Sequence, residues 1–93
     1  EVALEMPNVF TPNNDGANDF FTPVTMLRVA SFKMSIYNRW GSLVYEYAGQ
    51  EPIWDGNDMQ SRELAGGVYF YIINYSDLFG NAYTLNGEVT LLR

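Results

Sequence analysis

The sequence contains neither cysteine nor histidine. Without cysteine the chain forms no disulfide and no thiolate metal site, although the redox compartment cannot be identified from this absence because many secreted domains avoid cysteine. Without histidine it lacks the commonest protein metal ligand and the usual general base near neutral pH. Catalytic sites that pair Ser or Cys with His are therefore excluded.

Basic residues are few as well. Five Lys and Arg face eleven Asp and Glu, which gives a formal net charge of −6 at pH 7. An acidic chain is repelled by nucleic-acid phosphates and by anionic lipid. Because the basic residues are also scattered along the chain, we expect no nucleic-acid binding. They are Arg28, Lys33, Arg39, Arg62 and Arg93.

Long apolar runs are missing too. No segment approaches the roughly 20 apolar residues that a membrane-spanning helix needs, and no signal peptide is visible. The chain starts at Glu1 rather than at Met. We therefore expect a single domain, residues 1–93, excised from a longer protein, with any export signal upstream.

The residues that are present are typical of a globular domain. Apolar residues make up 47% of the 93-residue chain and aromatic residues 16%, whereas charged residues make up 17%. This composition is not that of a disordered chain. A chain of this length buries roughly 60–70% of the surface it exposes when unfolded, which supports one hydrophobic core.

Apolar residues alternate with polar ones in the middle of the chain. Phe32, Met34 and Ile36 alternate with Lys33, Ser35 and Tyr37, which is the period-2 pattern of a half-buried strand. A turn at 38–41, with Gly41 in the left-handed position, then leads to a second strand at 42–47. The two segments are predicted to form a hairpin.

Other segments have strand character. Residues 67–75 are the most apolar and are predicted to form a central strand buried on both faces. Residues 77–81 are predicted to be a turn. Further strands are expected at 2–6, near 53–54 and at 82–92, the last with a bulge at Asn86-Gly87. No helical periodicity is present, so the fold expected is all-β, an immunoglobulin-like antiparallel β-sandwich of about seven strands.

The loop at 11–19 is rich in hard oxygen ligands. Asn13, Asp15, Asn18 and Asp19 suit Ca²⁺ by chemistry. An EF-hand is excluded because its first and twelfth positions would hold Thr11 and Thr22. A different kind of calcium loop remains one hypothesis, and a turn held by Asx side-chain hydrogen bonds is the interpretation that we favour. No other cofactor is expected.

Several aromatic residues admit two interpretations. Trp54-Asp55-Gly56 is interpreted as a Trp packed over one end of the core, with Asp55 bonded to its own turn, rather than as a recognition patch. Trp40 is likewise expected to pack at the end of a hairpin. The tyrosines are expected to form a cross-strand ladder rather than a sugar-binding surface. They are Tyr37, Tyr45, Tyr47, Tyr69, Tyr71 and Tyr75.

Paired carboxylates are the remaining catalytic candidates. Asp15 with Asp19, and Asp55 with Asp58, lie in turn-rich segments of an acidic chain, where such pairs arise by chance. A domain of this size also leaves little room for a walled cleft. We therefore expect that the chain is not an enzyme.

Five blocks, taken together and in order, resemble a known family. The sequence resembles the gliding-motility-associated C-terminal domain, the type B sorting domain of the type IX secretion system of Bacteroidota. Two departures are Asn14, where the family often has Gly, and the stretch 63–66, which replaces a proline-bearing turn. The blocks are residues 7–21 (PNVFTPNNDGANDFF), 36–41 (IYNRWG) with 44–46 (VYE), 54–56 (WDG), 67–72 (GVYFYI) and 87–93 (GEVTLLR).

The resemblance implies a targeting function. Such a domain directs secreted cargo, carried upstream in the same chain, through the type IX system to the cell surface or the medium. The implied partners are the outer-membrane translocon or its shuttle proteins. The implied location is the periplasm in transit and then the surface or the outside.

Partner recognition is expected at the final strand. Residues 87–93 are accessible as a chain end and, at a sheet edge, would pair with a receptor strand. The loop 11–19 is the alternative. The candidate residues are Gly87, Glu88, Val89, Thr90, Leu91, Leu92 and Arg93. Two other functions stay open, a structural or adhesive immunoglobulin-like spacer and a carbohydrate-binding module.

Overall fold

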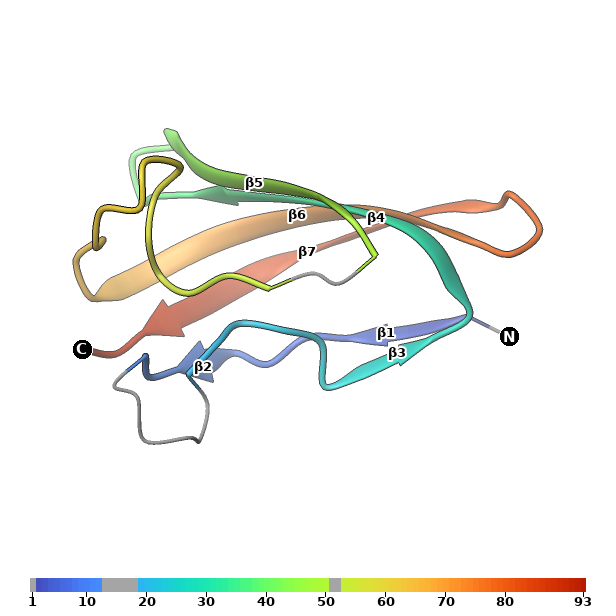
Figure 1. Cartoon of the computed structure of the whole chain (residues 1–93), viewed down its shortest axis with the longest axis horizontal. Helices are drawn as coiled ribbons and strands as arrows, with labels where there is room; N and C mark the ends of the chain where they lie inside the picture. The colour runs from blue at the N-terminus through green and yellow to red at the C-terminus, as the bar shows by residue number, and fades with distance from the viewer. Residues whose placement is uncertain (1, 13–18, 51–52) are drawn as a thin grey trace.

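The computed structural model describes residues 2–12, 19–50 and 53–93. Within these residues the chain folds into strands joined by turns (Figure 1). None of the described residues forms a helix that is long and apolar enough to cross a bilayer. The strands are β1 (Ala3–Glu5), β2 (Val9–Phe10), β3 (Thr25–Leu27), β4 (Val29–Tyr37), β5 (Leu43–Gly49), β6 (Gly67–Asp77) and β7 (Ala82–Leu91).

Two sheets of unequal size make up the sandwich. The larger has the order β2-β7-β6-β4-β5, and the smaller is the antiparallel pair β1-β3. Figure 1 shows the small sheet lying across one face of the large one. The all-β sandwich predicted from the alternation is confirmed. One pair departs from the antiparallel prediction, because β2 runs parallel to β7.

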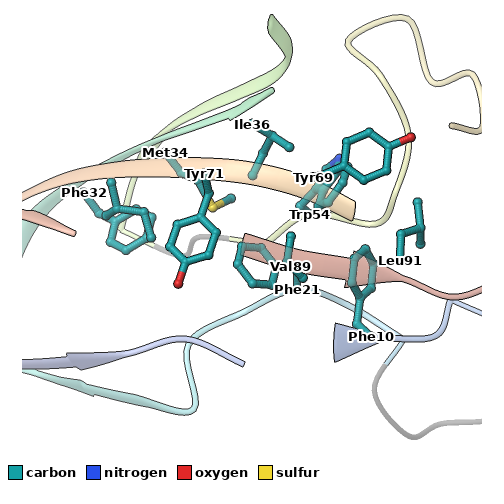
Figure 2. Close-up of a cluster of buried hydrophobic side chains, with 11 residues drawn as sticks. Phe10, Phe21, Phe32, Met34, Ile36, Trp54, Tyr69, Tyr71, Val89 and Leu91 are labelled. Atoms are coloured by element: carbon teal, nitrogen blue, oxygen red, sulfur yellow. The ribbon is translucent and has the colours of Figure 1, made fainter. Parts of the chain in front are cut away.

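The hydrophobic core lies between the layers (Figure 2). The large sheet supplies alternate residues of β4, β6 and β7, such as Met34, Ile73 and Val89, each fully buried. Phe10 of β2, at the edge of the same sheet, and Phe21, from the segment before β3, pack against them and are also buried. Trp54 closes one end of the core, and its backbone pairs with that of Phe21 in an isolated bridge.

The predicted hairpin in the middle of the chain is confirmed. β4 pairs with β5, and Gly41 in the connecting turn has a φ of 83°. That left-handed backbone is the conformation that glycine adopts without strain. The structure adds one feature that the alternation did not predict, a register shift between Ile36 and Tyr37.

β6 is central, as predicted, but it is not buried on both faces. Tyr69, Tyr71 and Ile73 point into the core, whereas Val68 and Phe70 on the opposite face are 42% and 38% exposed. The small sheet covers only one face of the large sheet, so the apolar run does not imply two covered faces. The prediction of a doubly buried strand was wrong.

The predicted bulge at Asn86-Gly87 is also absent. β7 pairs with β6 without a register shift from Ala82 to Leu91, and Gly87 lies opposite Tyr71. A Cβ on Gly87 would lie 2.8 Å from the Tyr71 hydroxyl oxygen. Glycine at this position therefore makes room for the tyrosine ring rather than breaking the strand.

Candidate functional site

The predicted recognition segment, residues 87–93, is the last part of β7 and the chain end. Its side chains alternate between two faces. Val89 and Leu91 point inward and are fully buried, whereas Leu92 is 50% exposed. Glu88 is exposed, and Thr90 is half-buried. The segment therefore combines core residues and surface residues, so truncating it would remove both kinds at once.

The end of β7 is not a free sheet edge. Val9 pairs with Thr90 and Phe10 with Leu91. The Thr90 amide donates to the Asn8 carbonyl at 2.9 Å, and the Leu92 amide donates to the Phe10 carbonyl at 3.1 Å. We expected residues 87–93 to lie at a sheet edge, and this was wrong for residues 90–92 because β2 pairs with them. Over the described residues, β7 has only β6 as a strand partner from Ala82 to Val89.

Arg93 is anchored rather than loose. Its Nε donates to the Leu64 carbonyl at 2.6 Å, and its Nη2 donates to the Gly56 carbonyl at 2.8 Å. Its Nη1 also lies 3.9 Å from a carboxylate oxygen of Glu63. The Arg93 side chain therefore connects the chain end to the 56–64 loop, and most of its guanidinium group is engaged in these contacts.

The Trp54-Asp55-Gly56 segment supports this end of the core, as predicted. Trp54 is fully buried, and its Nε1 donates to the Asn57 carbonyl at 2.8 Å. The Asp55 carboxylate accepts from the Asn57 amide at 3.0 Å. Phe10 and Tyr69 pack against the indole ring, with centroid distances of 5.2 Å and 5.4 Å.

Two tyrosines of the predicted aromatic set line the core. Tyr69 and Tyr71 are 7% and 8% exposed. Burial raises the pKa of both hydroxyls, and the Tyr69 hydroxyl donates to the Ala65 carbonyl at 2.6 Å. These two rings are therefore core residues and present no face to a sugar. Elsewhere on the sheet, Tyr75 stacks on Tyr83 across the strands at 5.3 Å.

Trp40 does not pack at the end of a hairpin. Its side chain is 74% exposed, and the Arg39 guanidinium lies 4.4 Å from its ring centroid. The prediction of packing was wrong. The Asn38 side chain accepts from the backbone amides of Trp40 and Ser42 and holds the turn without help from the indole.

The predicted calcium loop is described only in part. Asn13, Asp15 and Asn18 lie outside the described residues. Asp19 lines a shallow hollow of about 210 Å³ together with Asp55, Glu63 and Arg93. Among the described residues, no three carboxylates lie close enough together to hold a metal ion. Calcium binding therefore stays a prediction, which a comparison of melting temperatures in Ca²⁺ and in EDTA would test.

Asp55 and Asp58, the second predicted carboxylate pair, both accept hydrogen bonds within local turns. The Asp58 carboxylate accepts from the backbone amides of Gln60 and Arg62 and lies 3.0 Å from the Arg62 Nε. The amide donated by Arg62 is the main cause that lowers the pKa of Asp58. Asp55 caps the preceding turn. The pKa of Asp58 is thus lowered, rather than raised as expected of a general acid.

The sequence analysis did not predict the apolar surface of the β6–β7 turn. It predicted a turn at 77–81 but not that the turn presents two large apolar side chains, Leu78 and Phe79, to solvent. The signal was present in the sequence, since an Asx residue at the start of a turn organises the backbone after it. Leu and Phe directly after Asp77 could have been predicted to point outward.

One comparison with known proteins identifies a family, and another identifies a solved structure with the same fold. Residues 4–90 match the family described as the CHU_C Type IX secretion signal domain. A solved structure from work on PorZ, described as an essential bacterial surface component of the type-IX secretion system of Porphyromonas gingivalis, shares the fold with a TM-score of 0.55 and 19% identity. That match covers 99% of this chain but 11% of the other chain. No curated protein matches.

Proposed function

The chain belongs to the family of CHU_C type IX secretion signal domains, and we propose that its signal is read from the intact sandwich rather than from a linear peptide. As a domain of this family, it is a sorting signal that directs a cargo through the type IX system to the cell surface or the medium. The partners proposed are the outer-membrane translocon or its shuttle proteins. The cargo would lie upstream in the same chain and pass through the periplasm.

One observation supports reading of the folded domain. Val89 and Leu91 are fully buried, and the backbone between them is hydrogen-bonded to β6 on one side and, near its end, to β2 on the other. A receptor that needed residues 87–93 as an extended peptide would have to pull this strand out of the core. Because the loss of one such core side chain costs about 2–5 kcal/mol, that route is unfavourable. The surface side chains Glu88, Thr90 and Leu92 remain available for recognition.

We also propose that the domain has no catalytic activity. The family is one of secretion signals and not of enzymes. Asp55 and Asp58, the described pair of neighbouring carboxylates, are engaged in turn hydrogen bonds. These hydrogen bonds give both carboxylates a structural role, so the presence of the pair does not require a catalytic one.

A fusion experiment tests the sorting function. Residues 1–93 are placed behind a signal peptide and a fluorescent reporter, in a type IX-competent bacterium and in a strain without the translocon. Signal at the surface or in the medium of the competent strain alone is the expected result. A reporter retained in the periplasm of both strains would count against the domain as a sufficient signal.

A pair of neighbouring substitutions tests how the signal is read. Leu91→Asp places a charge in the core, and we expect it to unfold the domain and abolish export. Glu88→Lys combined with Leu92→Asp changes only exposed side chains and should lower export at an unchanged melting temperature. Normal export of the Leu91→Asp fusion would show that a linear peptide suffices, and normal export of the surface variant would exclude these side chains from recognition.

A further inference from the structure

The turn between β6 and β7 exposes two large apolar side chains. Leu78 is 65% exposed and Phe79 is 86% exposed. We call this pair the hairpin tip. Single exposed apolar residues are common on protein surfaces, but two adjacent ones at the end of a long hairpin form a concentrated apolar feature.

The turn that carries the hairpin tip is held by many hydrogen bonds. One Asp77 carboxylate oxygen accepts from the backbone amides of Phe79 and Asn81 at 2.9 Å each. The other accepts from the Asn81 side chain and from the Tyr83 hydroxyl, both at 3.0 Å. Gly80 has a φ of 87°, which allows the chain to reverse at this point. The turn is therefore organised before any partner arrives.

The hairpin tip also projects from the body of the protein. Asp77 pairs with Val29, the first residue of β4, so the turn lies beyond the end of the neighbouring strand. Figure 1 shows the β6–β7 turn extending past the small sheet at the end of the molecule that bears the N-terminus. A projecting turn of this kind can enter a pocket that the flat face of the sheet could not reach.

The charges near the hairpin tip favour a protein partner over a membrane. From Glu63 to Leu92 the sequence has no Lys or Arg, and the net charge of the chain is −6. Apolar segments that insert into anionic bilayers are usually accompanied by basic residues that contact the headgroups. Arg28 precedes Val29, the residue that pairs with Asp77 at the start of the turn. A neutral, apolar pocket on a protein is the better chemical complement.

We propose that the hairpin tip inserts into an apolar pocket on a protein component of the secretion machinery. This inference rests on the proposed function and adds a second contact surface to it, at the opposite end of β7 from the chain end. Preorganisation by Asp77 lowers the ordering cost that binding would otherwise carry. Aromatic side chains held on rigid supports are the usual anchors of such interfaces.

The experiment uses the same reporter fusion in the type IX-competent strain. Leu78→Ser combined with Phe79→Ser removes the apolar side chains and retains Asp77 and Gly80. We expect export to fall by roughly tenfold or more, as for the loss of a binding anchor. The melting temperature of the purified variant should match that of the unchanged domain. Val24→Ser, at a residue that is 66% exposed elsewhere on the surface, is the matched control and should be exported normally.

The outcomes separate this inference from the proposed function. If the unchanged fusion is exported and the tip variant is exported equally well, the tip inference is wrong and the sorting function stands. If the unchanged fusion is not exported, the sorting function itself fails. Since the reporter replaces the native cargo, a defect in the tip variant cannot arise from lost contact with a neighbouring native domain.

Two measurements on the purified domain test the two alternative partners of the hairpin tip, a membrane and a second copy of the chain. Sedimentation with vesicles that contain anionic phospholipid, reduced in the tip variant, would indicate a membrane and overturn the inference. A dimer in analytical ultracentrifugation that the tip variant dissociates would indicate a second copy and overturn it as well. We expect a monomer that stays in the supernatant.

Discussion

Asp77 shows how one carboxylate organises a turn. Its four hydrogen bonds, with that of the Asn81 side chain the strongest influence, lower its pKa from 3.8 to about 2. The hydrogen bond to Asp77 is also the main reason that the pKa of Tyr83 is raised. The residue is 8% exposed, so its charge is stabilised by these donors rather than by bulk water.

The depressed pKa of Asp77 predicts a pH dependence of stability. Because the folded-state pKa lies below the unfolded-state value, the contribution of this group is complete above about pH 4 and is lost as the pH falls towards 2. We expect Asp77→Asn to melt at a lower temperature than the unchanged domain at pH 6, with the difference shrinking by pH 2. Thermal melts followed by circular dichroism measure this. Glu88→Gln, at an exposed position, is the control, and a difference that is constant with pH would contradict the prediction.

Gly87 provides a second prediction at this scale. A Cβ would lie 2.8 Å from the Tyr71 hydroxyl oxygen and 3.0 Å from the ring carbon that bears it. Because Tyr71 is buried, the ring has little room to move. Gly87→Ala should therefore lower the free energy of unfolding by about 1–3 kcal/mol, although alanine is otherwise the better strand residue.

Urea unfolding of Gly87→Ala measures that change. Asn86→Ala, at the exposed neighbouring position, is the control and should change stability by about 0.5 kcal/mol or less. A stabilised Gly87→Ala variant would show that strand propensity outweighs the contact with Tyr71.

At the scale of the element, β7 combines the structural role of its buried side chains with the recognition role that we propose for its exposed ones. Its inward residues fill the core, and its outward residues face solvent. The strand is also the partner of β2, which brings Phe10 into the core. Deleting residues 89–93 would therefore remove core side chains and a strand pairing at once, and loss of export would report unfolding rather than lost recognition.

Neighbouring leucines at the end of β7 give the prediction for this element. Leu91 is fully buried, whereas Leu92 is 50% exposed. Leu91→Ala should lower the free energy of unfolding by about 2–5 kcal/mol. Leu92→Ala should change it by about 0.5 kcal/mol or less. Urea unfolding of both variants decides this, and equal losses would contradict the inward placement of Leu91 and the outward placement of Leu92.

At the scale of the whole molecule, Trp54 links parts of the chain that are distant in sequence. Its backbone pairs with Phe21, and its ring contacts Phe10 of β2 and Tyr69 of β6. The ring of Trp54 therefore joins β2, β6 and the Phe21 segment at one end of the core.

The two tryptophans offer a matched test of that dependence. Trp54→Phe loses a buried hydrogen bond and part of the ring, and we expect the free energy of unfolding to fall by about 2 kcal/mol or more. Trp40→Phe, at a side chain that is 74% exposed, should leave stability nearly unchanged. Denaturation followed by far-ultraviolet circular dichroism measures both. A larger loss from Trp40→Phe would contradict the assignment of Trp54 as the tryptophan that is buried in the core.

The sequence by itself determined the local structure and the family of this protein. Alternation at 32–37, the turn with Gly41 and the turn-bonding role of Asp55 follow from interactions within a few residues. The blocks that resemble sorting domains are also short segments, which can be recognised in the sequence without coordinates. The family match over residues 4–90 agrees with them.

Only the tertiary structure decided which surfaces are covered. The exposed outer face of β6, the cover that β2 gives to the end of β7 and the room that Gly87 makes for Tyr71 all depend on segments far apart in sequence. Period-2 alternation fixes which side chains share a face, but not whether another layer lies on that face. Whether a face is covered depends on packing between segments that are distant in sequence. In this protein no described segment covers the hairpin tip, which is exposed to solvent.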